Sequence, residues 1–408
     1  MRTRFINLFS EFFKSEQASG IILILCTITS IAVANSASGE GFIDFWHTKI
    51  GFDSGPIHLK LTLEHWINDG LMAIFFLLIG LEIERELYIG ELSNPRKAIL
   101  PIFAALGGMA TPAFLYFLFN RGTETAGGIG IPMATDIAFA LGALSLLGRR
   151  IPLSLKVFLT ALAIIDDLGA IVMIALFYVG DFSFLYFALS IGIFLALLAI
   201  NRLGVRHLAF YLIPGAVMWY CMVQSGVHAT LSGVLLAFAI PFGQAKEISP
   251  SYKLQHFLHR PVAFLIMPIF AIANTGIILS GNLLAGLGTP NSMGILAGLI
   301  LGKPIGIVAF TWLSIRLGLS QLPNKVDWLH VLGAGFLAGI GFTMSIFITL
   351  LAFTDAGIVQ NSKIAILTSS LIAGSIGLVI LRLRKDKPVH RHEHRKHEPT
   401  AETTEPDS

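Results

Sequence analysis

Charged residues are scarce in this sequence. Asp, Glu, Lys and Arg supply 13% of the 408 residues, whereas hydrophobic residues supply 54%; soluble globular domains carry roughly twice that charged fraction. The scarcity excludes a soluble globular protein and indicates a membrane protein. Cysteine is scarce as well. Cys26 and Cys221 both fall inside apolar runs, which excludes a disulfide framework and favours two small buried residues.

Long apolar runs occupy most of the chain. About twelve approach the roughly 20 residues that cross a bilayer core, and their connections are too short to hold separate soluble domains. We therefore predict an all-α polytopic membrane protein with one transmembrane domain over residues 1–381. Basic residues gather in alternate loops, so the positive-inside rule places both termini in the cytoplasm. No cofactor, no enzymatic activity and no nucleic-acid partner are expected.

The first outer loop and the C-terminal tail are the two segments without a helical pattern. Apolar and polar residues alternate over residues 57–63, after a turn signal, which predicts a small β-hairpin at residues 45–63. A lone hairpin leaves open edges, so pairing with a second copy would give a homodimer; an irregular loop is the alternative. Residues 382–408 are polar and are predicted to form a disordered cytoplasmic tail. Four tail histidines could instead bind a metal: His390, His392, His394 and His397.

A few ionisable residues lie within the apolar runs, where charge is costly and usually functional. They are Asp69, Asp136, Asp166, Asp167 and Lys303, with His228 as a polar companion. Asp166 and Asp167 are adjacent in ALAIIDDLGAIVM and point about 100° apart on a helix, so both can border one aqueous path. Such a pair can hold either protons or a small hard cation, and the competition between them is itself a coupling mechanism. The alternative is that the acids only satisfy buried donors.

Lys303 lies about one turn into its run and can pair with Asp166; the alternative is a lysine that reaches the cytoplasmic interface. Two other runs are poor continuous helices. GGIGIPMATDIAFALG has Pro132 beside Thr135 and Asp136, and LGAGFLAGIGFTMS repeats glycine. Interrupted helices at membrane depth line cavities, and their ends carry partial charges. Asp136 can offset the partial positive charge at helix N-terminal ends, and Lys303 can offset the partial negative charge at helix C-terminal ends. Close helix packing is the alternative reading of the glycines.

The two interruptions occupy matching places in the chain. They fall in the fourth and eleventh runs, the middle members of spans 3–5 (residues 98–179) and spans 10–12 (residues 293–381). An odd separation of seven spans gives the two triplets opposite orientations. We therefore predict an inverted repeat with a midplane site where the interrupted helices 4 and 11 cross.

The sequence resembles the NhaA family of sodium/proton antiporters over residues 8–382. The resemblance rests on WINDGLMAIFFLLIGLEIERELYIGEL, IPMATDIAFALGALSLLG, LTALAIIDDLGAIVMIALFY, SGVHATLSGVL, LILGKPIGI and GFTMSIFI, in family order and spacing. It implies a bacterial inner-membrane protein in which Asp166 and Asp167 bind sodium (or lithium) and protons at the base of a cytoplasmic funnel. Lys303 would partner Asp166, and Thr135 and Asp136 would lie where the broken helices cross.

The resemblance also implies regulation by pH. The family's pH-responsive cytoplasmic cluster maps onto Glu82, Arg85 and Glu86, and onto the stretch QHFLH with His256. Gln255 stands where a glutamate is expected, and an amide cannot titrate, so the pH set-point or steepness should differ. His228 matches a family histidine tied to the pH response, or it simply packs.

The residues also predict the charge balance of the exchange. Two carboxylates, with Lys303 as a possible third titrating group, can carry more than one proton against each sodium ion, and two are expected. The exchange should then be electrogenic. The alternatives are a passive cation channel, an intramembrane aspartyl protease, whose Tyr-Asp and Gly-x-Gly-Asp patterns are absent, and proton-driven uptake of an organic solute.

Overall fold

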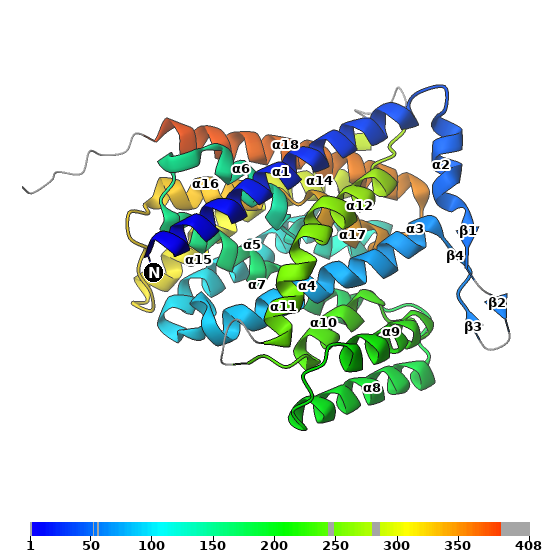
Figure 1. Cartoon of the computed structure of the whole chain (residues 1–408). Coiled ribbons are helices and arrows are strands. Elements are labelled where there is room, and N and C mark those ends of the chain that lie inside the picture. The colour runs from blue at the N-terminus through cyan, green and yellow to red at the C-terminus, as the bar shows by residue number, and fades with distance from the viewer. Residues whose placement is uncertain (1, 52, 55–56, 244–248, 280–285, 385–408) are drawn as a thin grey trace, which may run out of the picture.

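The computed structural model describes residues 2–51, 53–54, 57–243, 249–279 and 286–384, and most of them are helical (Figure 1). Short π-helical pieces at Trp66–Leu71, Val262–Ile266 and Gly298–Gly302 join neighbouring helices into longer ones. The helices are α1 (Arg2–Ala34), α2 (Gly39–His47), α3 (Leu63–His65), α4 (Met72–Ile89), α5 (Pro95–Asn120), α6 (Ile137–Leu146), α7 (Leu153–Phe177), α8 (Phe184–Arg202), α9 (Ala209–Gln224), α10 (Thr230–Ala239), α11 (Pro250–Pro261), α12 (Met267–Asn274), α14 (Pro290–Ala297), α15 (Lys303–Arg316), α16 (Trp328–Ala338), α17 (Phe342–Ala352) and α18 (Ala356–Leu383).

Many of these helices can cross a membrane. Within the described residues, eight are long and apolar enough, and the number rises to ten if each of two bent pairs is one span. The prediction of a helical polytopic membrane protein is therefore confirmed. Two further apolar helices, α9 and α10, have 16 and 10 residues, fewer than the roughly 20 that a membrane crossing needs. The number of twelve spans thus stays a prediction.

The two bent pairs fall where proline and glycine interrupt the sequence pattern. The 3-10 helix Glu124–Met133 meets α6 at 43°, and α16 meets α17 at 45°. Residues 134–136 are extended between the first pair, and residues 339–341 separate the second. The breaks contact each other directly, because the Asp136 amide donates to the carbonyl oxygen of Ile340 at 2.7 Å. Their crossing as halves of an inverted repeat remains a prediction.

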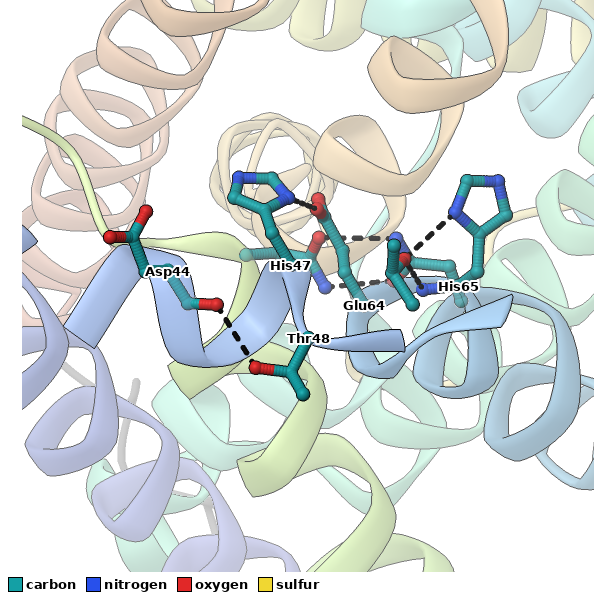
Figure 2. A network of polar contacts seen from close by, with 8 residues as sticks. Asp44, His47, Thr48, Glu64 and His65 are labelled. Carbon is teal, nitrogen blue, oxygen red and sulfur yellow. Dashed lines mark hydrogen bonds and ion pairs between the residues drawn. The ribbon is translucent and has the colours of Figure 1, made fainter. Parts of the chain in front are cut away.

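The outer loop does form a hairpin, in two short antiparallel pieces. β1 (Lys49–Ile50) pairs with β4 (Leu61–Thr62), and β2 (Asp53–Ser54) pairs with β3 (Ile57–His58). The predicted boundaries were too wide, since residues 45–47 continue α2 and Leu63 begins α3. The base of the hairpin joins these helices, because the Leu63 amide donates to Thr48 O at 3.0 Å. Figure 2 shows a second link between them: His47 Nδ1 of α2 lies 3.6 Å from Glu64 Oε2 of α3.

The C-terminal boundary also differs slightly from the prediction. Helix α18 runs to Leu383, two residues beyond the expected end of the transmembrane domain, because Arg382 and Leu383 continue its helical pattern. The predicted disordered tail and its four histidines fall on residues 385–408, outside the described part of the chain.

Helices α5 and α15 pack together with their backbones almost touching. A β-carbon on Gly306 of α15 would lie 2.0 Å from the Gly107 carbonyl oxygen of α5, and one on Gly107 would lie 2.2 Å from the Gly306 carbonyl oxygen. Only glycine permits this approach at both positions. The contact lies three residues from Lys303, so it fixes where that side chain enters the interior.

We predict that Gly306→Ala destabilises the protein while Gly192→Ala does not. A methyl group at position 306 must push α5 and α15 apart, at a cost of about 1–3 kcal/mol. Gly192 on α8 faces open space, so alanine there should be neutral or slightly stabilising. The measurement is chemical unfolding of the purified protein in detergent. Equal midpoints for the two variants would contradict the packing argument.

Candidate functional site

Helix α7 carries the two adjacent aspartates into the centre of the molecule. The exposed fraction of Asp166 is 0% and that of Asp167 is 1%. Both lie in the middle of the helix among apolar residues, so no free backbone N–H of a helix end of α7 is close to them. A buried carboxylate needs compensation from its surroundings, and the two residues receive it differently.

Asp166 is compensated by a lysine and a hydroxyl group. Lys303 is also fully buried, and its Nζ is ion-paired with Asp166 Oδ2. Thr135 Oγ1, in the break before α6, accepts from Lys303 Nζ at 2.8 Å and lies 2.7 Å from Asp166 Oδ2. The same hydroxyl lies 2.8 Å from the Ala338 carbonyl oxygen. A hydroxyl has one proton, so Thr135 donates either to the carboxylate or to that carbonyl at any moment.

One oxygen of each carboxylate is buried without a hydrogen-bond donor. Oδ1 of Asp166 and Oδ1 of Asp167 are both buried and have no hydrogen-bond partner. Gly108 of α5 lies close by: a β-carbon there would lie 3.9 Å from Asp166 Oδ1. Carboxylate oxygens of this kind can accept a proton or coordinate a hard cation. The pair therefore presents two acceptor oxygens next to a single compensating lysine.

Asp136 is a buried cap for two helices at once. Its Oδ1 accepts from the Phe139 amide at 3.0 Å at the start of α6. Its Oδ2 accepts from the Thr343 amide at 3.1 Å, and from the Thr343 hydroxyl, at the start of α17. Helix N-termini carry partial positive charge, and the contacts place this carboxylate at the N-terminal ends of α6 and α17. Lys303 donates to Thr135 Oγ1, which lies 2.8 Å from the Ala338 carbonyl oxygen at the end of α16.

The residues mapped onto the pH-responsive cluster come together in part. Glu82 Oε1 of α4 lies 4.0 Å from His259 Nδ1 of α11. Arg85 pairs with Glu86 at 2.9 Å, and Glu86 Oε2 accepts from the Glu91 amide at 3.0 Å.

The two histidines of the QHFLH stretch on α11 lie differently. His256 is exposed, with its ring centroid 4.3 Å from that of Tyr252, whereas His259 lies beside Glu82. Gln255 is buried at 6% exposure. It lies one turn from Ser251, and that serine's hydroxyl donates to buried Glu84 at 3.1 Å.

Two predicted candidates lie away from both clusters. His228 follows α9, its Nε2 atom is buried without a hydrogen-bond partner, and the ring contacts the backbone of Tyr178. Asp69 lies in the π-helical piece before α4, and its carbonyl oxygen accepts from Trp219 Nε1 at 2.9 Å. Neither residue joins Asp166 or Glu82 through a hydrogen bond or ion pair among those described.

Comparisons with known proteins agree on one family. The family described as Na+/H+ antiporter 1 matches residues 10–381. A Na(+)/H(+) antiporter NhaA of Flavobacterium psychrophilum is 58% identical over 376 residues, covering 92% of this chain and 96% of the relative. One from Dechloromonas aromatica is 55% identical over 384 residues, covering 93% and 97%.

The chain belongs to the NhaA family of Na+/H+ antiporters. Together with its apolar helices, membership makes it a multi-pass membrane transporter. The resemblance drawn from the sequence motifs is thereby confirmed.

Sequence reasoning missed several residues of this NhaA site. Thr343 gave no signal, because its bond to Asp136 depends on two breaks 207 residues apart. Glu84 was passed over among the charges at the end of α4. His259 could have been found, since it lies four residues after Gln255 and therefore shares its helical face.

We predict that Asp136→Ala destabilises the protein more than Asp355→Ala. Asp355 caps α18 alone, by accepting from the Ile358 amide at 2.8 Å at an exposed site, so its loss should cost about 1 kcal/mol. Asp136 serves two buried helix ends, and its loss should cost about 2–4 kcal/mol. Urea or guanidinium unfolding in detergent measures both. A smaller loss at position 136 would mean that the double cap contributes nothing beyond an ordinary one.

Proposed function

We propose that this chain exchanges Na+ for H+ across a membrane, and that Asp166 and Asp167 bind both ions. The observation that carries the proposal is the buried Asp166–Lys303 pair next to Asp167, with one donor-free oxygen on each carboxylate. The names of the NhaA relatives, Na(+)/H(+) antiporters, support the same activity. Li+ is expected to substitute for Na+, since it is another small hard cation.

Competition for one site would couple the two ions. In the proton-bound state Asp167 is neutral and Asp166 is ion-paired with Lys303, so neither carboxylate is free to attract a cation. When Na+ enters, it takes oxygens of both Asp166 and Asp167. The Asp167 proton must then leave, and Lys303 is the group that can release a second proton. Lys303 then loses its charged partner, and Thr135 Oγ1 is placed to accept from its Nζ. The Thr135 hydroxyl can then donate its proton to the Ala338 carbonyl oxygen at the end of α16. The hydrogen bonding at this helix end would therefore depend on which ion is bound.

The rival functions fit the geometry less well. An aspartyl protease needs two carboxylates that face each other and share a proton, whereas these two are consecutive on one helix and one of them is held by a lysine. A passive channel does not need a carboxylate that, like Asp166, can bind either a lysine or a cation. A transporter of organic solutes would need groups that clamp the solute, and the site offers two carboxylates, one lysine and one hydroxyl.

The topology proposals follow from the same residues. The broken pairs would be the middle members of an inverted repeat that cross at the membrane midplane. The basic loops would place both termini in the cytoplasm, at a bacterial inner membrane. The hairpin of β1 and β4 is proposed to pair with a second copy as a homodimer. Its support is that β1 and β4 pair only with each other among the described strands, so that both edges of this small sheet are open.

Regulation by pH is proposed for the contact between α4 and α11. Glu82 with His259, and Glu84 with Ser251, place titratable groups on both sides of that contact. A change in their protonation would alter how the two helices pack. Arg85, Glu86 and His256 lie on the same two helices, and His228 is proposed as a separate contributor.

The first prediction concerns the dyad. Asp166→Asn and Asp167→Asn should each reduce sodium-dependent proton movement to the level of vesicles without the transporter, because an amide neither binds a proton nor neutralises Na+. Asp181→Asn, at an exposed loop position, is the matched control and should exchange normally. The assay is a pH dye in everted vesicles after addition of Na+. Exchange that persists in either dyad variant would remove that residue from the mechanism.

The second prediction concerns charge balance. We expect two protons to move against each Na+, so that each cycle moves a net charge across the membrane. An imposed potential then changes the free energy of exchange by about 2.3 kcal/mol per net charge per 100 mV. A potassium-diffusion potential in proteoliposomes, with equal pH on both sides, should therefore accelerate or slow exchange according to its sign. An exchange rate indifferent to potential would make the exchange electroneutral.

The third prediction concerns Gln255, which stands where the family resemblance leads us to expect a glutamate. Gln255→Glu places a titratable group on the same face of α11 as Ser251, toward Glu84, and should move the pH midpoint of exchange by up to about 1 unit. Gln360→Glu on α18 is the control for adding one negative charge. If both variants keep the wild-type midpoint, position 255 takes no part in the pH response.

A further inference from the structure

An apolar pocket lies apart from the ion site. It has a volume of about 580 Å³ and is lined by α9, α10 and residues 63–77, which run from α3 through the π-helical piece into α4. Figure 1 shows α9 between α10 and α8, with α8 at the edge of the bundle. Its lining is almost wholly apolar, and small residues on each of the three walls, Gly70, Ala73, Gly215, Ala216 and Gly233, make it hollow.

Two of these glycines bring the helices together at the floor. A β-carbon on Gly233 of α10 would lie 2.1 Å from the Ala73 carbonyl oxygen of α4, and one on Gly215 of α9 would lie 2.6 Å from Leu236. The close approach keeps the walls in place, so the pocket is a fixed feature of the packing. Apolar walls gain dispersion contacts when an apolar chain packs against them, so the lining favours a hydrocarbon ligand.

Stacked tryptophans mark the outer end of the pocket. Trp66 and Trp219 lie 5.7 Å apart between ring centroids. Each indole N–H donates to a backbone carbonyl: Trp66 to Ile50 of the hairpin and Trp219 to Asp69, both at 2.9 Å. Tryptophans with a polar partner on one side and an apolar wall on the other sit at the level of lipid headgroups. The hairpin end of the pocket is therefore at the membrane surface.

The length of the pocket matches one leaflet of a bilayer. From Trp66 to Leu77, both of which line it, the chain advances eleven residues, or about 16 Å along a helix. Half of a hydrocarbon core is about 15 Å thick. The pocket thus runs from headgroup level to the membrane centre, along the path that a lipid chain follows.

We propose that this pocket binds one acyl chain of a phospholipid from the leaflet on the hairpin side. The chain lies along α4 between α9 and α10, with its first carbons beside Trp66 and Trp219 and its end near Leu77. The site is separate from Asp166 and Asp167, and it depends on no property of the exchange reaction. By filling the pocket, the chain ties the hairpin end of α4 to α9 and α10.

Tryptophan fluorescence provides the test. Replacing Trp46, Trp312 and Trp328 by Phe leaves Trp66 and Trp219 as the reporters among the five tryptophans of the chain. This protein is reconstituted in phosphatidylcholine vesicles with and without bromine on the upper part of the acyl chains. Bromine should quench the emission strongly. Ala216→Phe, which fills the pocket from α9, should reduce the quenching at least twofold.

The control is the next residue on the same helix. Val217 is 50% exposed and does not line the pocket, so Val217→Phe should leave quenching unchanged. Gly70→Leu is a second filling variant, since a β-carbon there makes only ordinary contacts with Trp66 and Trp219, at 3.6 and 3.8 Å. Native mass spectrometry should find one phospholipid retained by the Val217→Phe protein and lost from both filling variants.

Two results would overturn the proposal. One is quenching that is the same in the filling variants and the control. The other is a filling variant that changes the monomer–dimer equilibrium but leaves quenching and retained lipid unaltered, which would show that a second copy of the chain covers the pocket.

Discussion

The buried ion pair between Asp166 and Lys303 constrains the rest of the structure. Two charges removed from water are tolerated only when each compensates the other and their remaining hydrogen-bonding groups are satisfied. Thr135 supplies that further contact, and it lies in a helix break. The close packing of Gly107 against Gly306 brings Lys303 to the right depth. The glycines, the broken helix and the dyad thus serve a single electrostatic arrangement.

The two broken helices stabilise each other in the same way. Every interruption at membrane depth exposes backbone groups that water cannot reach. Here the Asp136 amide donates to Ile340 O, and Ser345 Oγ donates to Ile131 O at 2.7 Å. Asp136 caps both following helices. Each break therefore supplies hydrogen-bond partners to the other. A small movement of one break must shift the other if these bonds are to be kept. Under the proposed function, this linkage lets ion binding at Asp166 change the packing around it.

Sequence patterns predicted the parts that depend on local composition. The helical character, the two interruptions and the hairpin follow from apolar runs, from Pro132 with its neighbouring glycines, and from alternation over residues 57–63. The limits of the hairpin were too wide because residues 45–47 fit a helix as well as a strand. The contact of Thr343 with Asp136 could not be read in the same way, since it depends on tertiary packing between segments 207 residues apart in the chain. The apolar pocket gave no signal because small residues on three helices create it jointly.

The central claim is that Na+ and protons compete for the carboxylates of Asp166 and Asp167. The most direct measurement is calorimetric titration of the purified protein with Na+ in several buffers of different ionisation enthalpy, which counts the protons released for each ion bound. The account predicts that Na+ binding releases more than one proton at a pH where the dyad is protonated, and that Asp167→Asn abolishes both binding and release. Na+ binding without proton release would contradict it.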